Sequence, residues 1–410
     1  MNLLAPFGAL GNSRFARLYA AQTVSQIGGA FTWVALALLA FELAGTNAAV
    51  VLGAALTLRV TAFVLLSPLA GVLADRLERK TILLSTHFGR AVIIGLMPLV
   101  TDVWQVYVLM FALNALTAFF TPTNQATVPL VVGRDDAGQA FALSSATTEL
   151  LAIIGPGFAG ILAALVGGRT LFYFDAASFA LAGLLVLTLP SLRAVQQGEV
   201  QASRWRDVRD GTTRLWRDPP VRFALLMELV AAITGALILV VTVVRVQGGL
   251  NLGEVQYGWV MAIYGLGATV ASLAVGAAGK RVPRTLFILI GAVLTSLAIL
   301  LGDVAALAPL MALWLVAGVG QNWVNLPTET LLAERTDESA QGRVYGAHFA
   351  WSHLWWAFAY PLASLLSSQT AHAFLYGGLI ALAVLLIVVL SLRHAVVLRF
   401  APVDRATEAP

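Results

Sequence analysis

The chain has 410 residues, of which 59% are hydrophobic and 11% are charged, and its formal net charge is +4. Soluble globular proteins are about 45–50% apolar and about 25% charged, so this composition excludes an ordinary soluble enzyme and a disordered protein. A single soluble core does not grow large enough to hide so much apolar surface. The environment that suits this chain is a lipid bilayer.

Apolar runs long enough to cross a bilayer recur along the whole chain. A spanning helix needs about 20 mostly apolar residues, and the runs here are continuous rather than alternating, which favours helices over a β-barrel. The sequence therefore predicts an all-α membrane protein with twelve transmembrane helices in two six-helix halves. The expected spans are 18–44, 47–72, 80–101, 103–125, 139–166, 169–190, 221–246, 254–279, 285–301, 305–328, 342–368 and 372–393.

Most of the 25 basic residues lie in connections on the same side as the two termini. The excess of Lys and Arg in cytoplasmic connections predicts that both termini are cytoplasmic, in a multi-pass protein of the cytoplasmic (inner) membrane. The basic residues form no stripe with interleaved aromatic residues, so no nucleic-acid partner is expected. The chain has no cysteine, which excludes disulfides and thiolate metal sites. We expect no cofactor and a monomer.

A long polar break separates the first six spans from the last six. It covers 191–220 and contains Trp205 and Trp216 among many Arg and Asp residues. It is either an amphipathic helix on the inner membrane surface or a solvated linker. The expected organisation is an N-terminal half over 1–190, this linker, a C-terminal half over 221–400 and a cytoplasmic tail over 401–410.

The two halves align without a gap when residue numbers are offset by 205, which indicates an internal repeat. The matched positions are Arg17 with Arg222, Gly53 with Gly258, Gly71 with Gly276, Arg76 with Arg281, Arg79 with Arg284, Leu84 with Leu289, Pro122 with Pro327 and Thr123 with Thr328. Parallel repeats of six helices are one plan of secondary transporters, with the substrate bound between the halves. No phosphate-binding G-x-x-x-x-G-K-[ST] motif is present, which counts against a primary pump.

A loop between the second and third spans, GVLADRLERKTIL at 71–83, carries a recognisable pattern. It resembles the loop signature of the major facilitator superfamily, with Gly71, Asp75, Arg76, Arg79 and Lys80 at the matching positions. The resemblance implies that this loop forms the inward gate, where carboxylates meet helix N-termini and arginines. In the second half Lys280 stands at the position of Asp75, so the gate is expected to be asymmetric.

The fifth span carries IIGPGFAG, which resembles the Gly-Pro motif of antiporter branches of that superfamily. Its matching residues are Gly155, Pro156, Gly157 and Gly160, which allow close helix approach and a bend. Two further segments, at 124–146 and 204–226, resemble the branch of macrolide-efflux and enterobactin-exporter proteins. Related branches include lysophospholipid flippases, so the resemblance leaves the substrate open.

Charged residues inside spans are candidates for function because each costs at least about 2.5–3.5 kcal/mol to insert. Glu149 and Glu228 are candidates for proton coupling or for binding a cationic substrate. The alternative is a structural ion pair, with an arginine of the inner gate for Glu228 and with a basic residue for Glu149. His348 and His353 are candidates for a proton relay, with aromatic packing as the alternative. Arg59 requires a counter-charge or an anionic ligand, and Arg90 and Asp175 are interpreted as structural pairs.

Further polar residues fall on the spans that line the pathway in the family that the chain resembles. Amides and hydroxyls beside aromatic rings suit a large amphipathic ligand, although they also hold helices together by hydrogen bonds. The cavity candidates on these spans are Gln22, Gln26, Trp33, Asn114, Thr117, Thr121, Asn124, Thr234, Gln321, Asn322 and Asn325, and Arg59 of the second span is a further candidate.

These observations predict a secondary active transporter rather than an enzyme. The expected task is proton-coupled export of amphipathic or cationic compounds, as in a multidrug antiporter, by alternating access. One alternative is a lysophospholipid flippase or siderophore exporter that uses Arg59 and Arg90. A second is a divalent-metal exporter, against which the few histidines count. A third is a membrane receptor without transport, against which the lack of an extramembrane domain counts.

Overall fold

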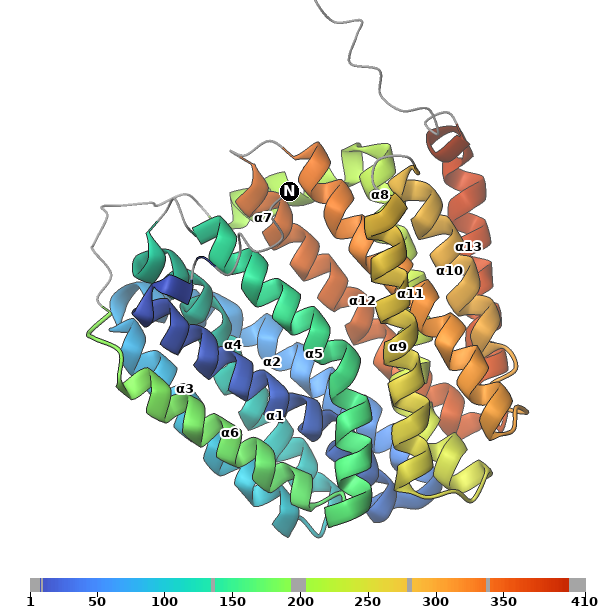
Figure 1. The fold of residues 1–410 in the computed structure, drawn as a ribbon. Helices are drawn as coiled ribbons and strands as arrows, with labels where there is room; N and C mark the ends of the chain where they lie inside the picture. Colours follow the sequence, from blue (N-terminus) through green and yellow to red (C-terminus); the bar gives the residue numbers. More distant parts are fainter. Residues whose placement is uncertain are drawn as a thin grey trace, which may run out of the picture. The chain divides into compact units, whose positions relative to one another are not determined.

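The computed structural model of the chain describes residue 8 and residues 10–133, 137–192, 204–278, 282–336 and 340–397, and in these residues it has helices and connections but no strand. The chain groups into two compact units (Figure 1). Unit 1 comprises Met1–Glu199 and Val246–Ala262, and unit 2 comprises Val200–Arg245 and Ile263–Pro410. Helix α9 is thus divided between the units. The boundaries of the two halves and the linker that the sequence indicates remain a prediction.

Unit 1 contains the first six long helices. They are α1 (Ser13–Ala44), α2 (Ala48–Arg76), α3 (Arg79–Leu96), α4 (Val103–Val132), α5 (Ala137–Val166) and α6 (Thr170–Leu187), with short 3₁₀ turns at Gly45–Asn47 and Met97–Leu99. Helix α6 packs against both α1 and α3, while α4 packs against α2 and α3. Helix α1 also contacts α5, so it lies against most of its own bundle.

Unit 2 contains a short helix followed by the second set of long helices. They are α7 (Arg204–Arg217), α8 (Pro219–Val243), most of α9 (Glu254–Ala278), α10 (Arg284–Ile299), α11 (Leu307–Arg335), α12 (Gln341–Gln369) and α13 (Ala373–Val397). A π-helical turn, Val244–Gly249, follows α8. Helix α8 is the centre of this unit, because α10, α11, α12 and α13 all pack against it.

The helix starts agree with the repeat found in the sequence. Helices α1 and α8 begin at Ser13 and Pro219, and helices α3 and α10 begin at Arg79 and Arg284. Helices α6 and α13 begin at Thr170 and Ala373. The difference in residue number stays close to that of the sequence repeat from the first pair to the last. Matched residues of the repeat therefore occupy corresponding turns of corresponding helices.

Local signals explain where several helices begin and end. The side chain of Asn12 accepts hydrogen bonds from the backbone N–H groups of Arg14 and Phe15 and so caps α1. Asp102 and Gln105 form a reciprocal capping box at the start of α4. Helix α4 ends at Val132 and is followed by Gly133, whose positive φ of 88° suits a residue without a side chain.

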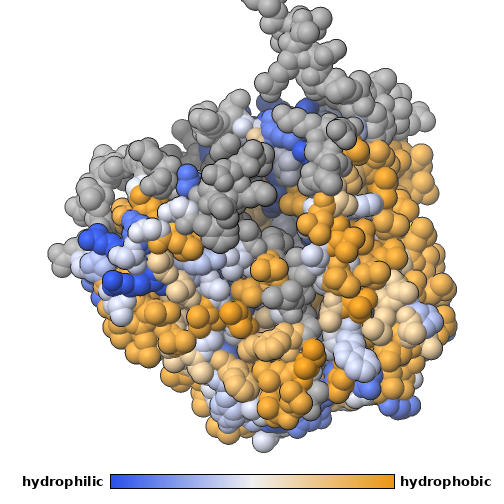
Figure 2. Space-filling view, viewed as in Figure 1, coloured by the Kyte–Doolittle hydropathy of each residue, from blue (hydrophilic) through white to orange (hydrophobic). Residues whose placement is uncertain are grey.

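The surface in view is largely apolar, as a bilayer requires (Figure 2). Among the described residues, eight segments are long and apolar enough to cross a membrane, and the first of them, Ser13–Leu66, contains both α1 and most of α2. Leu165, Leu273 and Leu99 are examples of large apolar side chains at the surface, with 76%, 71% and 66% of their area exposed. The chain is therefore an all-helical, multi-pass membrane protein.

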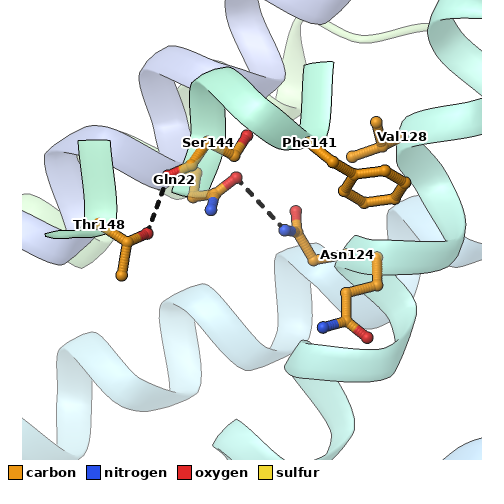
Figure 3. Close-up of a pocket in the computed structure, with 7 residues that line it drawn as sticks. Gln22, Asn124, Val128, Phe141, Ser144 and Thr148 are labelled. Carbon is orange, nitrogen blue, oxygen red and sulfur yellow. Dashed lines mark hydrogen bonds between the residues drawn. The ribbon is translucent and has the colours of Figure 1, made fainter. Parts of the chain in front are cut away.

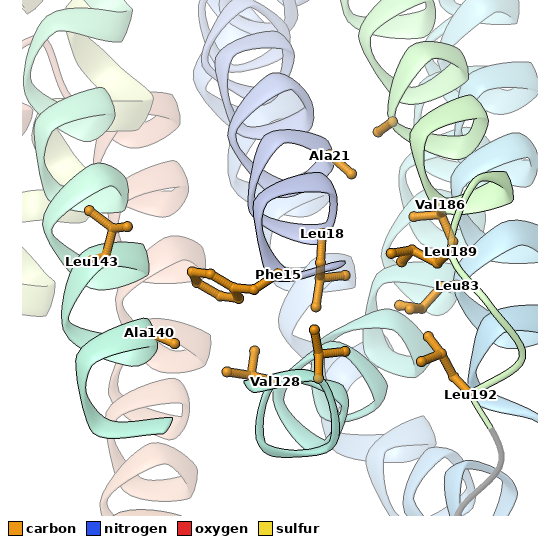
Figure 4. Packing of buried hydrophobic residues seen from close by; sticks show 12 residues of the cluster. Phe15, Leu18, Ala21, Leu83, Val128, Ala140, Leu143, Val186, Leu189 and Leu192 are labelled. Carbon is orange, nitrogen blue, oxygen red and sulfur yellow. The ribbon is translucent and has the colours of Figure 1, made fainter. Parts of the chain in front are cut away.

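A close-packed apolar cluster joins the ends of several helices of unit 1 (Figure 4). Phe15 and Leu18 of α1 lie in it beside Leu83 of α3, Val128 of α4 and Leu143 of α5. Each of these five side chains is at most 4% exposed. The cluster fixes the end of α1 against its neighbours and so positions the polar residues that follow on α1.

Candidate functional site

In unit 2 a buried carboxylate and a buried histidine meet. The Nε2 atom of His348, on α12, lies 2.9 and 3.0 Å from the two carboxylate oxygens of Glu228, on α8. The side chains of His348 and Glu228 are 7% and 9% exposed. A charged group in this position must have a partner, and each residue supplies it for the other.

A second carboxylate lies on the other side of the same imidazole. The Nδ1 atom of His348 is 3.7 Å from Oε1 of Glu329, on α11, and the Glu329 side chain is 55% exposed. The ring therefore lies between an enclosed carboxylate and an open one. Such a cluster can exchange a proton with solvent through Glu329 and pass it to the enclosed pair, since imidazole titrates near neutral pH.

The sequence pointed to Glu228 and His348 separately and did not bring them together. It offered an arginine as the structural partner of Glu228, whereas the structure brings Glu228 to His348. Glu329 was missed, although the repeat offers a signal: at the offset of 205 it corresponds to Asn124, a cavity candidate. His353 points elsewhere, since its ring stacks on Phe349 with the ring centroids 3.8 Å apart.

In unit 1 the cavity candidates Gln22 and Asn124 line a polar pocket of about 230 Å³ (Figure 3). The lining comes from α1, α4 and α5 and consists of Gln22, Asn124, Gln125, Val128, Phe141, Ser144 and Thr148. The Nδ2 atom of Asn124 lies 3.5 Å from Oε1 of Gln22, and the side chain of Gln26 donates to the hydroxyl of Thr148 at 2.9 Å.

Two buried polar atoms of residues that line this pocket are unsatisfied. Within the described part of the chain, Oδ1 of Asn124 and Oγ of Ser144 have no hydrogen-bond partner. The two residues are only 8% and 9% exposed, and an unpaired buried polar atom costs about 1–3 kcal/mol. The lining combines amides and hydroxyls with the ring of Phe141 and carries no charge, which suits an amphipathic molecule with a few polar groups.

The repeat relates the pocket of unit 1 to the charged cluster of unit 2. At the offset of 205, Thr23 corresponds to Glu228, Asn124 to Glu329 and Leu143 to His348. The first half thus holds neutral side chains at the positions where the second half holds two acids and a histidine. Corresponding places in the two halves are specialised for different chemistry.

The other cavity candidates are placed as follows. Thr117, Thr121 and Asn114 donate to carbonyl groups one turn back on α4. The Thr234 hydroxyl is buried beside Thr295 at 3.1 Å, and Asn322 accepts a hydrogen bond from Ser272 at 3.2 Å. Gln321 is buried, whereas Asn325 is exposed. In the first half, the Arg59 guanidinium lies over the ring of Trp33, 4.7 Å from its centroid.

Arg90 and Asp175 are buried in unit 1, where their charges interact, and each also has further partners of its own. Asp175 accepts hydrogen bonds from Thr32 of α1 at 2.5 Å and from Ser178 at 3.1 Å. The Arg90 guanidinium lies over the rings of Phe120 and Phe179, at 4.1 and 4.5 Å from the centroids. Both residues are at most 4% exposed, so these charges hold helices together and are not accessible to a ligand.

Several expected site residues have side chains outside the described residues. These are Glu149, Gly71, Asp75, Arg76, Pro156 and Gly157, whose backbones belong to α2 and α5. Of the remaining gate candidates, Arg79 donates to the carbonyl of Ala126 at 2.6 Å, and Lys80 donates to the carbonyls of Leu187 and Leu189 at 2.8 and 2.5 Å. Gly160 packs against Gly258 of α9, and Gly155 packs against Ala30 of α1.

Long apolar helices that occur in two repeated sets, with polar sites buried among them, are the arrangement of a membrane transporter. Comparison with known families gives the same class: the sequence profile of the Major Facilitator Superfamily matches residues 18–253 and 224–408. The chain belongs to the major facilitator superfamily, whose members are transporters rather than enzymes.

Individual relatives are distant. The chain is 24% identical to the uncharacterized MFS-type transporter YfiS of Bacillus subtilis over 294 residues, which are 69% of this chain and 70% of YfiS. It is 28% identical to the multidrug resistance protein MdtG of Escherichia coli K12 over 287 residues, which are 68% of each chain.

Solved structures agree on the fold. The nucleoside transporter NupG matches with a TM-score of 0.71 at 15% identity, over 93% of this chain and 98% of NupG. A bacterial homologue of the lysosomal transporter Spinster, in an inward-facing and unoccupied conformation, matches with a TM-score of 0.71 at 10% identity, over 97% of each chain.

Proposed function

We propose that this transporter exports amphipathic or cationic compounds in exchange for protons, and that Glu228, His348 and Glu329 form its proton-coupling cluster. The observation that carries the proposal is the buried contact between Glu228 and His348, 2.9 Å apart. An ionisable cluster inside a membrane protein marks an ion pathway more often than a stabilising pair, because its insertion is costly.

The neutral pocket of unit 1 supplies the complementary function. Its unpaired atoms on Asn124 and Ser144 offer one amide oxygen and one hydroxyl to a ligand, and Phe141 offers an aromatic face. A compound with one cationic or polar end and an apolar body satisfies both. The resemblance to macrolide-efflux proteins and the 28% identity to a multidrug resistance protein support this substrate class.

The cycle proposed is alternating access, with both termini cytoplasmic, as the distribution of arginines indicates. The inward gate in this proposal consists of Gly71, Asp75, Arg76, Arg79 and Lys80. Arg79 and Lys80 already bind carbonyl groups at the ends of α4 and α6, so they can hold or release those ends as the gate moves. On α5, the residues proposed to take part in antiport are Glu149 and the motif of Gly155, Pro156, Gly157 and Gly160.

The decisive test is transport by the reconstituted protein. In proteoliposomes with an imposed pH gradient, we expect export of a fluorescent lipophilic cation by the wild type and loss of its pH dependence in Glu228→Gln and His348→Gln. Asp102→Asn, which alters an exposed carboxylate that caps α4, serves as the control and retains it. Wild-type pH dependence in folded Glu228→Gln contradicts the coupling role of this cluster.

The substrate class is tested by ligand binding to the purified protein. A ligand that binds only the folded state raises the melting temperature by mass action. Stabilisation by lipophilic cations and macrolides supports the exporter proposed here. Stabilisation by lysophospholipid or a catechol siderophore alone supports instead the alternative of a flippase or siderophore exporter for anionic substrates. Of the two arginines considered for that function, Arg59 is the less buried. Stabilisation by divalent metals alone supports a metal exporter, although in the described residues no group of three His, Cys, Asp or Glu side chains is arranged so that it could hold a metal ion.

A further inference from the structure

The short helix α7, within the linker between the two halves, packs directly onto α12, the helix that carries His348. A Cβ atom added to Gly211 would collide with the carbonyl oxygen of Arg343 and lie 2.8 Å from its carbonyl carbon and 2.9 Å from the Cβ of Ala347. Only glycine permits this approach of the two backbones. Ala347 immediately precedes His348, so α7 touches the turn of α12 from which His348 projects.

Polar and aromatic contacts extend this interface on both sides of His348. Before it, the carboxylate of Asp210 lies 3.2 Å from Nε of Arg214 and 3.4 Å from Nε of Arg343. After it, the rings of Trp216 and Trp351 meet edge to face with centroids 5.2 Å apart. Such aromatic pairs prefer this geometry and are worth about 0.5–1.5 kcal/mol beyond the area they bury.

The aromatic contact continues to the helix that carries Glu228. Trp351 packs against Trp355 with ring centroids 5.3 Å apart, and the indole N–H of Trp355 donates to the carbonyl of Leu225 on α8 at 3.0 Å. Leu225 lies three residues before Glu228. Trp216 on α7 is therefore connected through two tryptophans to the turn of α8 next to the carboxylate.

The end of α7 is also bonded to the helix that carries Glu329. Asp218 follows α7 and lies 2.7 Å from Nε of Arg335, at the last residue of α11. The segment from Asp210 to Asp218 therefore contacts α12 and α11 directly, and it contacts α8 both directly, where Arg222 donates to the carbonyl of Trp216, and through Trp355. These are the three helices that supply His348, Glu329 and Glu228.

We infer that α7 is a positioning element of the proton-coupling cluster, with Gly211 and Trp216 setting where the His348 ring stands relative to Glu228. The inference rests on the proposed function for its role in transport. In the described residues, the charged or titratable groups of the cluster and of its interface with α7 include Glu228 and Arg222 on α8, Glu329 and Arg335 on α11, Tyr345 and Arg343 on α12, Asp210 and Arg214 on α7, and Asp218 after it. None of them belongs to the pocket of unit 1.

The test measures the proton affinity of the His348 ring itself. Histidine-labelled protein in lipid nanodiscs gives a titration of each ring by carbon-13 NMR, and the signal lost in His348→Gln identifies His348. We expect Gly211→Val and Trp216→Ala to move its midpoint by about 0.5 pH unit or more, about threefold in proton affinity. Trp216→Phe retains an aromatic edge contact and is expected to restore the wild-type midpoint.

The matched control is Gly346→Val, since Gly346 lies on α12 itself and a Cβ there meets nothing within 4 Å. It is expected to keep the wild-type midpoint. If Gly211→Val does not fold, the comparison of the midpoints of Trp216→Ala and Trp216→Phe decides the question by itself. A wild-type midpoint in folded Gly211→Val and in Trp216→Ala overturns the inference, as does an equal shift in Gly346→Val.

Transport in the same preparations separates this inference from the proposed function. If Glu228→Gln exports the cation with wild-type pH dependence, the coupling proposal fails, while a shifted midpoint in Trp216→Ala still supports α7 as the element that positions His348. If Glu228→Gln loses that dependence and neither α7 variant moves the midpoint, the coupling proposal stands and the role of α7 is overturned.

Discussion

Nε2 of His348 lies 2.9 Å from Oε1 of Glu228, and 120 residues of chain separate the two. The contact joins α12 to α8 in the interior of unit 2. The other carboxylate beside the ring, that of Glu329, is 55% exposed and so is far better solvated than Glu228. The enclosed pair is thus mutually dependent, and removal of either member leaves the other buried without its closest partner.

A double-mutant cycle measures this dependence. We expect Glu228→Ala and His348→Ala each to lower the free energy of unfolding by about 1–3 kcal/mol, because each leaves a buried polar group unsatisfied. The double variant should lose less than the sum, with a coupling of about 0.5–3 kcal/mol. Thermal unfolding in detergent measures the three variants. Additive losses would show that the two side chains contribute independently.

The sequence predicted the fold because its physical signal is strong. Long apolar runs, arginines concentrated in connections and a constant offset between the halves specify a helical membrane protein with an internal repeat, and the helix starts stay close to that offset. Each of these features is local or periodic. They can be found without knowing which helices touch.

The site was predicted only in part because it depends on contacts between distant helices. Glu228 and His348 each stood out as costly polar residues in apolar spans, but the sequence does not show that α8 and α12 pack at this register. The sequence does not single out Glu329, because it lies near a helix end, where a charged residue is not unusual. Ser144 and Thr148 escaped notice because a hydroxyl in a membrane helix usually bonds to the carbonyl one turn back, as Thr148 does to Ser144.

The polar pocket of unit 1 makes a prediction about ligand binding. Asn124 contributes an unpaired Oδ1 to it and is 8% exposed. We expect Asn124→Ala to weaken binding of a lipophilic cation about three- to tenfold, the loss of one hydrogen bond worth about 0.5–1.5 kcal/mol. Isothermal titration calorimetry measures the effect. Asn47→Ala, at an exposed position, is the matched control, and equal affinity in Asn124→Ala would remove this pocket from the binding site.

Gly160 and Gly258 make a prediction about packing within unit 1. Their backbones touch, because a Cβ atom on Gly258 would lie only 2.5 Å from the Cα of Gly160, and a Cβ on Gly160 would collide with Gly258 in turn. Small residues allow such an approach of α5 and α9. We expect Gly160→Val to lower the free energy of unfolding by about 1–3 kcal/mol through overpacking.

The control for this substitution is Gly29→Val on α1, where a Cβ atom meets nothing within 4 Å. Thermal unfolding in the same detergent compares the two variants. A smaller loss in Gly160→Val than in Gly29→Val would mean that α5 and α9 are free to separate at this point, contrary to the packing described.

A last prediction concerns Asp303, in the connection between α10 and α11. Its carboxylate accepts hydrogen bonds from the backbone N–H groups of Phe374 and Leu375, at 3.3 and 2.9 Å, and so caps the start of α13. Burial raises the pKa of Asp303 above its ordinary value, although these two hydrogen bonds and the nearby His372 and Arg245 lower it in part. The folded protein therefore holds a proton on Asp303 more firmly than the unfolded chain does.

The sign of the pH dependence follows from that difference. Where the folded state binds more protons than the unfolded state, stability falls as the pH rises. Asp303 should thus make the protein less stable as the pH rises through the interval just above 3.8, the ordinary pKa of the group. Asp303→Asn keeps an acceptor for the two N–H groups, and we expect it to remove this slope without loss of the cap. Asp303→Ala should remove both the slope and the cap, and loss of the cap should lower the free energy of unfolding by about 0.5–2 kcal/mol.

Melting temperatures of the wild type and the two Asp303 variants, taken from mildly acidic to more acidic pH, measure the difference. Asp102→Asn, at the exposed cap of α4, is the control, because it removes a carboxylate from a similar position at the start of another helix. The slope should persist in Asp102→Asn and become shallower in Asp303→Asn, because burial raises the pKa of Asp303. An undiminished slope in Asp303→Asn would assign the acid dependence to other carboxylates.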